Sequence, residues 1–186
     1  IKDAVEILKK GGLIGFPSET VYGLGADATN NEAVLKIYRN KNRPRSNPLI
    51  VHVESIDQAK SIAFFNKKIN KIIDNFWPGP LTVVLKKNKK SKISNHLCAD
   101  LQTVAIRYPN NQTILTIIKN LGRPIAAPSA NKFGMLSPTS ALHVEKQFKD
   151  HNDIPLILDG GNTNIGIEST VIGIETVSYT HLRAHE

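Results

Sequence analysis

The stretch that most constrains this chain runs from Leu13 to Gly25 and reads Leu-Ile-Gly-Phe-Pro-Ser-Glu-Thr-Val-Tyr-Gly-Leu-Gly. Its apolar start is typical of a buried strand, and Pro17 ends that strand. The polar residues and the glycines that follow predict a turn whose backbone can approach a ligand closely. Such a turn at the end of a strand is where α/β proteins commonly bind ligands. The same residues also fit an ordinary strand-to-helix connection with Ser18 or Thr20 as the N-cap, so both interpretations stay open.

Predicted helices and strands alternate along the rest of the chain. Helices are expected over 1–10, 31–40 (with Asn31 as cap), 55–75 with a break near 65–66, 112–120, and from a cap at 137–139 to about 148. Strands are expected over 49–53, 81–85, 103–108, from 124 to the proline at 128, over 155–161 and from 169 to about 175. This alternation predicts one α/β domain, and 186 residues suffice for its core. The sheet should be mixed, because the two strands around the Asp-Gly-Gly turn at 159–161 look antiparallel.

The composition favours anionic partners but does not identify which one. The chain has 24 Lys and Arg against 16 Asp and Glu, a net charge of +8, which favours anionic partners such as nucleotides, RNA or anionic surfaces. Cys98 is the only cysteine, so an intrachain disulfide and a Cys-rich zinc site are excluded, and a reducing, cytoplasmic setting is expected. No apolar run approaches the roughly 20 residues of a membrane helix. The phosphate loop, dinucleotide fingerprint and nucleophile elbow motifs are absent, so a bound nucleotide needs another architecture.

Several charged segments are candidates for a binding site. Residues 41–48 hold three cations and two prolines, which predicts an extended basic loop suited to bidentate phosphate or carboxylate contacts. His52 follows in a predicted strand, where a lone histidine is more often structural than catalytic. Arg107 ends another predicted strand. The lysine run at 86–92 is typical of a solvated hairpin end, with a nucleic-acid patch as the less favoured alternative. Asp159 and Glu168 are either a carboxylate pair for a metal or turn residues.

Six segments, taken together and in this order, resemble the YrdC/TsaC family of threonylcarbamoyl-AMP synthases, over about residues 1–174. They are Phe-Pro-Ser-Glu-Thr-Val-Tyr-Gly-Leu-Gly (16–25), Lys-Asn-Arg-Pro-Arg-Ser-Asn-Pro-Leu-Ile-Val-His-Val (41–53), Phe-Trp-Pro-Gly-Pro-Leu-Thr (76–82), Val-Ala-Ile-Arg-Tyr-Pro (104–109), Ala-Pro-Ser-Ala-Asn (127–131) and Gly-Ile-Glu-Ser-Thr-Val (166–171). The resemblance implies a YrdC-like fold, a twisted mixed sheet flanked by helices with a concave basic cleft. It also implies a nucleotidyltransferase that forms threonylcarbamoyl-AMP and pyrophosphate from L-threonine, bicarbonate and ATP, with Mg²⁺ assisting. Other proteins then transfer the threonylcarbamoyl group to tRNA.

The resemblance also assigns roles to particular residues. The side facing threonine and bicarbonate is expected to comprise Thr20, His52, Arg107, Ala127 and Ser169. The nucleotide and phosphate side is expected to comprise Lys41, Arg43, Asn47, Thr103, Ser129, Asn131 and Ser137. This chemistry needs no covalent nucleophile, so no residue is assigned as nucleophile, acid or base, and His52 is expected to donate or accept a hydrogen bond. No metal ligand is assigned.

Two departures from the family pattern stand out. Ser18 occupies a position where the family often has threonine, which keeps the hydroxyl. The family also continues past its Ser-Thr-Val strand to a further strand and an Arg-Pro-Gly segment whose arginine contacts the nucleotide, whereas this chain ends Val-Ser-Tyr-Thr-His-Leu-Arg-Ala-His-Glu. We therefore expect a C-terminally incomplete domain over 1–176 and a non-native tail over 177–186, with a nucleotide contact missing.

Two other functions compete with the synthase. One is carbamoyl transfer in hydrogenase maturation by a relative of the same fold, against which the short chain and its single cysteine argue. The other is a double-stranded RNA or tRNA binding module of this fold without synthase activity, which the basic balance supports weakly. RNA affinity that is sensitive to salt and survives the loss of Arg43 and Arg107 would favour the RNA module. Loss of threonine or ATP binding on the same substitutions would favour the synthase.

Overall fold

The structure is a computed structural model that describes residues 1–149, 153–174 and 179–182. The break expected near 65–66 is present, between α3 and α4. The described helices are α1 (Lys2–Lys9), α2 (Asn31–Lys41), α3 (Ile56–Ile62), α4 (Lys67–Phe76), α5 (Gln112–Leu121) and α6 (Ala141–Phe148), with one 3₁₀ turn, η1 (Asn95–Cys98). No helix among these ranges is long and apolar enough to cross a membrane.

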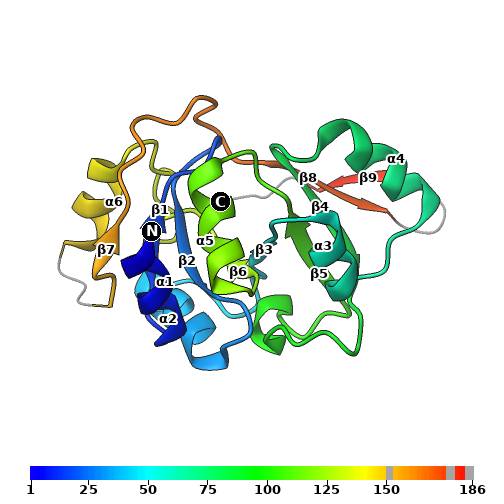
Figure 1. Cartoon of the computed structure of the whole chain (residues 1–186), viewed down its shortest axis with the longest axis horizontal. Coiled ribbons are helices and arrows are strands. Elements are labelled where there is room, and N and C mark those ends of the chain that lie inside the picture. Colours follow the sequence, from blue (N-terminus) through cyan, green and yellow to red (C-terminus); the bar gives the residue numbers. More distant parts are fainter. Residues whose placement is uncertain (150–152, 175–178, 183–186) are drawn as a thin grey trace.

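The strands form one mixed sheet in the order β7-β1-β2-β6-β3-β5-β4-β8-β9 (Figure 1). The pairs β1–β7, β3–β5 and β4–β8 are parallel and the others antiparallel, which confirms the predicted mixed α/β class. The strands are β1 (Ile14–Phe16), β2 (Gly23–Asp27), β3 (Ile50–His52), β4 (Leu81–Lys86), β5 (Thr103–Arg107), β6 (Ile125–Ala126), β7 (Leu156–Ile157), β8 (Thr170–Ile174) and β9 (Tyr179–Leu182).

The predicted antiparallel pair around the Asp-Gly-Gly turn is wrong. β7 pairs with β1 in parallel, and β8 pairs with β4 in parallel near the other end of the sheet. The segment between β7 and β8 crosses the top of the molecule in Figure 1 and passes over the β1–β2 loop. It is held there by backbone hydrogen bonds from Ile165 N to Glu19 O and from Gly166 N to Thr20 O, each 3.0 Å long. The Gly-rich turn therefore starts a long crossing and does not close a hairpin.

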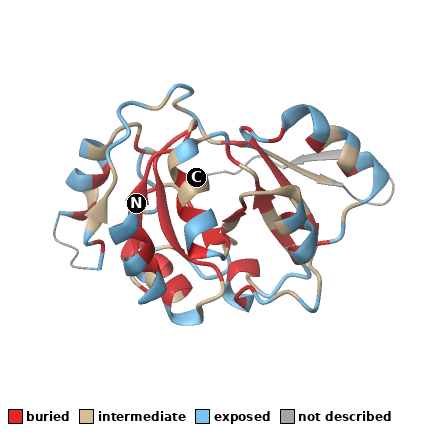
Figure 2. Ribbon diagram, in the orientation of Figure 1, coloured by how far each residue is buried: buried red, intermediate tan, exposed pale blue. Residues whose placement is uncertain are grey.

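Buried residues gather on the central strands and on parts of the helices around them (Figure 2). In β6 and just after it, Ile125 and Ala127 belong to one buried cluster and Ala126 to the other, as the alternation of a strand requires. The smaller cluster joins α1, β1 and α5, with Leu8 and Ile118 fully buried. The larger one joins α2, α3 and α4 to strands β2 to β5. The two clusters hold the middle strands rigidly between layers of helices.

The central stretch is a hairpin, which corrects the strand-to-helix interpretation of it. Gly23 pairs with Phe16 across β1 and β2, so the residues after the turn form a strand and neither Ser18 nor Thr20 caps a helix. The Ser18 hydroxyl organises the turn: it donates to Val21 O at 2.6 Å and accepts from the backbone N–H groups of Thr20 and Val21. The glycines serve packing, because a Cβ on Gly23 would lie 2.6 Å from Cζ of Phe16.

Gly23→Ala is therefore expected to destabilise the fold by about 1–3 kcal/mol, because the Phe16 ring is fully buried and must move into a packed core. Urea unfolding measures the change. Gly15→Ala in the same hairpin is the matched control, since its Cβ would lie 3.1 Å from Ile157 and should cost less. A Gly23→Ala protein as stable as the Gly15→Ala protein would contradict this packing account.

Two helix caps differ from the prediction by a few residues. Asn30, and not Asn31, caps α2 by accepting from Ala33 N at 3.1 Å. Ser140 caps α6 in place of the predicted 137–139 segment. Of the predicted tail at 177–186, residues 179–182 form β9 beside β8, and the remaining positions, like the predicted strand end at 175, lie outside the described residues. That the tail is non-native, and that the domain ends at 176, stay predictions.

Candidate active site

A pocket opens where the β1–β2 loop meets the ends of β3 and β5 and the residues after β6. Of the twelve residues that the resemblance assigns, it brings Thr20, His52, Arg107, Ala127 and Ser129 to one lining. Its cavity has a volume of about 20 Å³, room for roughly one water molecule. The other lining residues are Phe16, Ser18, Val21, Tyr22, Gly23, Ile50, Pro128 and Glu168.

Arg107 carries the positive charge of this pocket. Sheet pairing places it beside His52 of β3 and Thr82 of β4, and its side chain is 4% exposed. Nη1 donates to Thr20 Oγ1 at 2.9 Å, and Nη2 lies 2.7 Å from Glu19 Oε1 in an ion pair. Nη2 is itself buried, and among the described residues its contact is the Glu19 ion pair, without hydrogen-bond geometry. A buried, oriented guanidinium of this kind suits a carboxylate.

His52 is a neutral hydrogen-bonding group in this pocket. The pKa of His52 is lowered from 6.5 to about 3, mainly by burial and to a smaller extent by the positive charge of Arg107. The ring meets Phe16 edge-on at 6.1 Å between centroids. Its Nδ1 is buried and has no partner among the described residues, which leaves it available to a bound molecule.

This pKa predicts how stability changes with pH. In the unfolded chain His52 takes up a proton near pH 6.5, but in the folded chain only near pH 3. Between these values the unfolded state binds more protons, so the contribution of His52 to the unfolding free energy is full above pH 6.5 and falls as the pH is lowered, by at most about 1.4 kcal/mol per unit. His52→Gln should flatten the pH dependence of urea unfolding between pH 6.5 and 4.5. The exposed His143→Gln should leave it unchanged; equal slopes for all three proteins would contradict the assignment.

Ser169 lies next to the pocket and outside its lining. It is 8% exposed, and its Oγ is 2.7 Å from Oγ1 of Thr82, the cross-strand neighbour of Arg107. Thr82 is fully buried, and its hydroxyl holds the Ser169 hydroxyl in place. The predicted threonine-side residues therefore form one connected group, Ser169 through Thr82 and the others directly.

Lys41 is buried at 1% exposure and organises the loop after β6. Its Nζ donates to the carbonyl oxygens of Ser129, at 2.6 Å, and of Asn131. Asn131 in turn donates to the carbonyls of Lys132 and Met135. The ammonium thus ties the end of α2 to the 129–131 loop, whose Ser129 lines the pocket.

Arg43 and Asn47 stand together on the basic loop. Arg43 Nη2 donates to Asn47 Oδ1 at 2.8 Å and to Pro48 O at 3.0 Å, so the predicted extended loop is a closed turn. The guanidinium also lies over the Phe133 ring, 5.9 Å from its centroid. Phe133 is 40% exposed, so this pair forms a flat surface that can stack against a base.

The last two predicted nucleotide residues behave differently. Ser137 donates to Glu168 Oε1 at 2.7 Å and so lies beside the pocket lining. Thr103 begins β5 opposite Lys86, whereas Arg107 ends that strand. They are four positions apart, which is about 13 Å along the strand. Thr103 is not among the residues that line the pocket, because it stands at the other end of β5 from Arg107.

The sequence interpretation gave Glu19 no role, named Glu168 only as a metal ligand or turn residue, and named Ser18 only as a possible N-cap. Glu168 lines the pocket, Glu19 contacts Arg107 directly behind it, and Ser18 shapes the turn. Glu19 sits at the centre of the Ser-Glu-Thr triplet, and that position in the loop was the available signal. Asp159, the suggested partner of Glu168 for a metal, bonds to its own turn through Gly161 N at 2.9 Å. Within the described ranges no group of three or more His, Cys, Asp or Glu could hold a metal ion.

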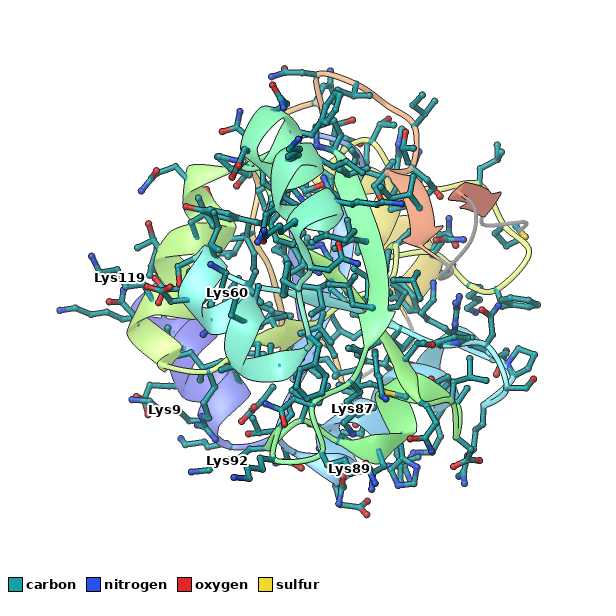
Figure 3. All side chains as sticks on the ribbon, turned by 90° about the vertical axis from the view of Figure 1, so that its right-hand side faces the viewer. Lys9, Lys60, Lys87, Lys89, Lys92 and Lys119 are labelled. Atoms are coloured by element: carbon teal, nitrogen blue, oxygen red, sulfur yellow. The ribbon has the colours of Figure 1, made fainter. Side chains whose placement is uncertain are left out.

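The lysine run lies apart from these residues. Figure 3 shows Lys87, Lys89 and Lys92 together at the lower end of the view, around the loop that follows β4. Lys87 Nζ donates to Asn95 Oδ1 at 2.7 Å, an exposed contact. A groove of about 480 Å³ lined by these lysines shares no residue with the pocket around Arg107. The arrangement fits the solvated hairpin end predicted from the sequence.

Comparisons with known proteins agree on one family. The family model for Sua5, YciO and YrdC, described as telomere recombination, matches residues 6–185. A protein of Pyrococcus abyssi called threonylcarbamoyl-AMP synthase is 45% identical over 175 residues, which is 94% of this chain and 50% of that protein. The crystal structure of P. abyssi Sua5 complexed with L-threonine superposes with a TM-score of 0.93 and 43% identity, over 98% of this chain and 53% of that one.

Relatives of different lengths share this region. The chain spans about half the length of several curated relatives, the P. abyssi protein included. A relative from Psychromonas ingrahamii, also called threonylcarbamoyl-AMP synthase, is 30% identical over 95% of this chain and 93% of its own length. The described domain therefore corresponds to half of some relatives and to nearly all of another.

Proposed function

Because the chain belongs to the Sua5/YciO/YrdC family, we propose that it forms threonylcarbamoyl-AMP and pyrophosphate from L-threonine, bicarbonate and ATP. The observation that carries this proposal is the pocket in which Arg107, Thr20 and His52 converge beside the loop held by Lys41. The P. abyssi relative whose structure is titled as a complex with L-threonine supports the choice of amino acid. The short P. ingrahamii relative supports the view that a domain of this length carries the activity.

The proposed chemistry forms and breaks three kinds of bond. The deprotonated amine of threonine attacks the carbon of bicarbonate, giving a carbamate with loss of water. A carbamate oxygen then attacks the α-phosphorus of ATP. The bond from that phosphorus to the bridging oxygen breaks, and pyrophosphate leaves with the electron pair. Catalysis of this kind consists mainly of holding three reactants together and balancing negative charge.

The charge and hydrogen-bonding groups of the site residues assign each of them to the amino acid or to the nucleotide. Arg107 faces the threonine carboxylate, because its guanidinium is the positive charge among the residues that line the pocket. The Thr20 hydroxyl and neutral His52 provide hydrogen bonds around the amino acid, and Ala127 presents backbone. On the nucleotide side, Arg43 and Phe133 offer a stacking surface and Lys41 provides charge behind the 129–131 loop.

Mg²⁺ belongs to the proposal as the ion that accompanies ATP. Glu168 lines the pocket and can supply one carboxylate oxygen, while the phosphates and water supply the others, as is usual for this ion. When bound, Mg²⁺ neutralises charge that develops on the leaving pyrophosphate.

The proposal extends to partners and place. The adenylate product is an activated acyl donor, so proteins that transfer the group to tRNA must act after this one. Cys98 is a free, buried thiol, which fits a reducing cytoplasm. Direct RNA binding rests on the lysine run alone, and the relatives quoted above are named as synthases.

Pyrophosphate release tests the proposal. We expect release from ATP only when L-threonine and bicarbonate are both present, with loss of signal when any one is omitted. Release independent of threonine would overturn it. RNA affinity that falls with salt but survives Arg43→Ala and Arg107→Ala, in a protein without pyrophosphate release, would move the assignment to the RNA-binding module.

A further inference from the structure

Glu19 is a buried carboxylate to which the proposed reaction gives no role. Its side chain is 10% exposed, and Oε1 lies 2.7 Å from Arg107 Nη2. Oε1 also accepts a hydrogen bond from the backbone N–H of Asn110 at 3.0 Å, just past the end of β5. Oε2 is buried without a hydrogen-bond partner among the described residues. Burying a carboxylate costs desolvation free energy, and proteins tolerate that cost where the carboxylate balances a buried positive charge.

Glu19 lies behind the pocket and does not line it. The pocket lining includes Thr20 and Arg107 but not Glu19, so Glu19 has no direct access to a ligand in that space. Its charge reaches the ligand only through the guanidinium of Arg107. The geometry therefore assigns it to holding Arg107, and does not make it a competitor for the position that a carboxylate ligand takes.

Three contacts fix the guanidinium in a plane. Glu19 holds Nη2, Thr20 Oγ1 holds Nη1 at 2.9 Å, and Gly79 O accepts from Nε at 3.4 Å. Glu19 and Thr20 are consecutive in the β1–β2 loop, so one short segment contacts both terminal nitrogens of the Arg107 guanidinium. Of these three, only the Glu19 contact is between opposite charges.

The backbone of the same two residues holds the segment that leads to Ser169. Glu19 O accepts from Ile165 N, and Thr20 O accepts from Gly166 N, both at 3.0 Å. The Ser-Glu-Thr triplet thus links the end of β5 to the crossing segment between β7 and β8. A shift of Glu19 would move Arg107 and that segment together.

We propose that Glu19 is a positioning residue for the amino-acid substrate: it holds the Arg107 guanidinium in the orientation that receives the substrate carboxylate. This inference rests on the proposed function. The contact is equally useful before and after the bond to phosphorus forms, since the carboxylate does not react. Glu19 therefore sets the affinity for threonine and has little influence on the rate of the bound complex.

Glu19→Gln tests the inference, because it keeps the side-chain size and an oxygen for Asn110 N–H but removes the charge. In pyrophosphate release we expect the KM for L-threonine to rise about tenfold or more, with kcat and the KM for ATP nearly unchanged. A purely structural role would lower the active fraction, and so kcat, without changing KM. Glu32→Gln is the matched control: it breaks an exposed ion pair with Arg39, 4.0 Å long, and should leave all constants unchanged.

A double-mutant cycle separates action through Arg107 from other effects. Glu19→Gln added to Arg107→Met should cause no further loss of threonine affinity in calorimetry. The same addition should raise the urea midpoint of Arg107→Met, because it removes a buried charge that has lost its partner. Independent, multiplicative losses of affinity would overturn the inference.

The outcomes distinguish this inference from the function on which it rests. Wild-type protein without threonine-dependent pyrophosphate release overturns the function. An active wild type with an unchanged threonine KM in Glu19→Gln overturns only the role of Glu19. If Glu19→Gln does not fold, Glu19→Asp keeps the charge but is one methylene shorter, so the same selective rise in KM is expected, and an unchanged KM would overturn the inference.

Discussion

Arg107→Met is expected to weaken the binding of L-threonine about 30-fold or more and, with it, to abolish pyrophosphate release at threonine concentrations near the wild-type KM. The guanidinium is 4% exposed and is the positive group in the pocket lining, so its loss leaves a substrate carboxylate desolvated without a partner. Losses of 2–5 kcal/mol are usual when one member of a buried charge pair is removed, about 30-fold to several thousand-fold in affinity. Calorimetric titration of L-threonine in the absence of ATP measures the effect without relying on turnover.

The fold should also weaken, since Glu19 then keeps a buried charge without its partner, at about 3–5 kcal/mol. Arg123→Met is the control for this confounding effect. Arg123 pairs with the buried Asp27 at 2.6 Å, at the far end of β2, and it does not line the pocket. It should lose stability but bind threonine normally. Threonine affinity that falls equally in both proteins would show that Arg107 acts through stability alone.

Lys41→Met is expected to lower ATP affinity at least about tenfold and to destabilise the protein. Methionine has similar length but no donors, so the carbonyl oxygens of Ser129 and Asn131 lose their shared ammonium partner. Each buried carbonyl left unsatisfied costs about 1–3 kcal/mol, and the 129–131 loop loses its link to α2. Loss of the charge also weakens the attraction for phosphate. Titration with a non-hydrolysable ATP analogue measures the affinity.

Lys36→Met is the matched control for Lys41→Met. Lys36 lies on the same helix, and its Nζ also donates to a backbone carbonyl, Gly11 O at 2.8 Å. Gly11 lies before β1 and outside the pocket lining, so nucleotide affinity should be unchanged. Unchanged nucleotide affinity in Lys41→Met would mean that the ammonium serves packing only.

Local patterns predicted the helices and most strands well. The break between α3 and α4 follows from Asn66, whose side chain accepts from Ile69 N and starts a new helix. Long-range pairing was beyond such patterns. Nothing near the Asp-Gly-Gly turn reveals that β7 joins β1 while β8 joins β4, because both contacts are parallel and link distant segments. The β1–β2 hairpin was not predicted, because its glycines suggest a turn, whereas in the structure they make room for the Phe16 ring.

The candidate site divides in the same way. Arg107, His52, Thr20 and Ala127 could be named in advance because each stands at a strand end or in a loop that matches a family segment. Glu19 could not, because its role depends on Arg107, 88 positions later in the chain, coming within 2.7 Å. Thr103 shows the converse: it lies close to Arg107 in sequence, but the two stand at opposite ends of β5, and Thr103 is not among the residues that line the pocket.

The most direct test of the proposed function is to identify the product made from ¹³C-bicarbonate, L-threonine and ATP. The account predicts an adenylate that contains threonine and one labelled carbon, formed in equal amount to pyrophosphate and absent with Arg107→Met. An unlabelled threonyl-adenylate, or pyrophosphate without any adduct, would contradict the claim that this pocket joins a carbamate of threonine to the α-phosphate.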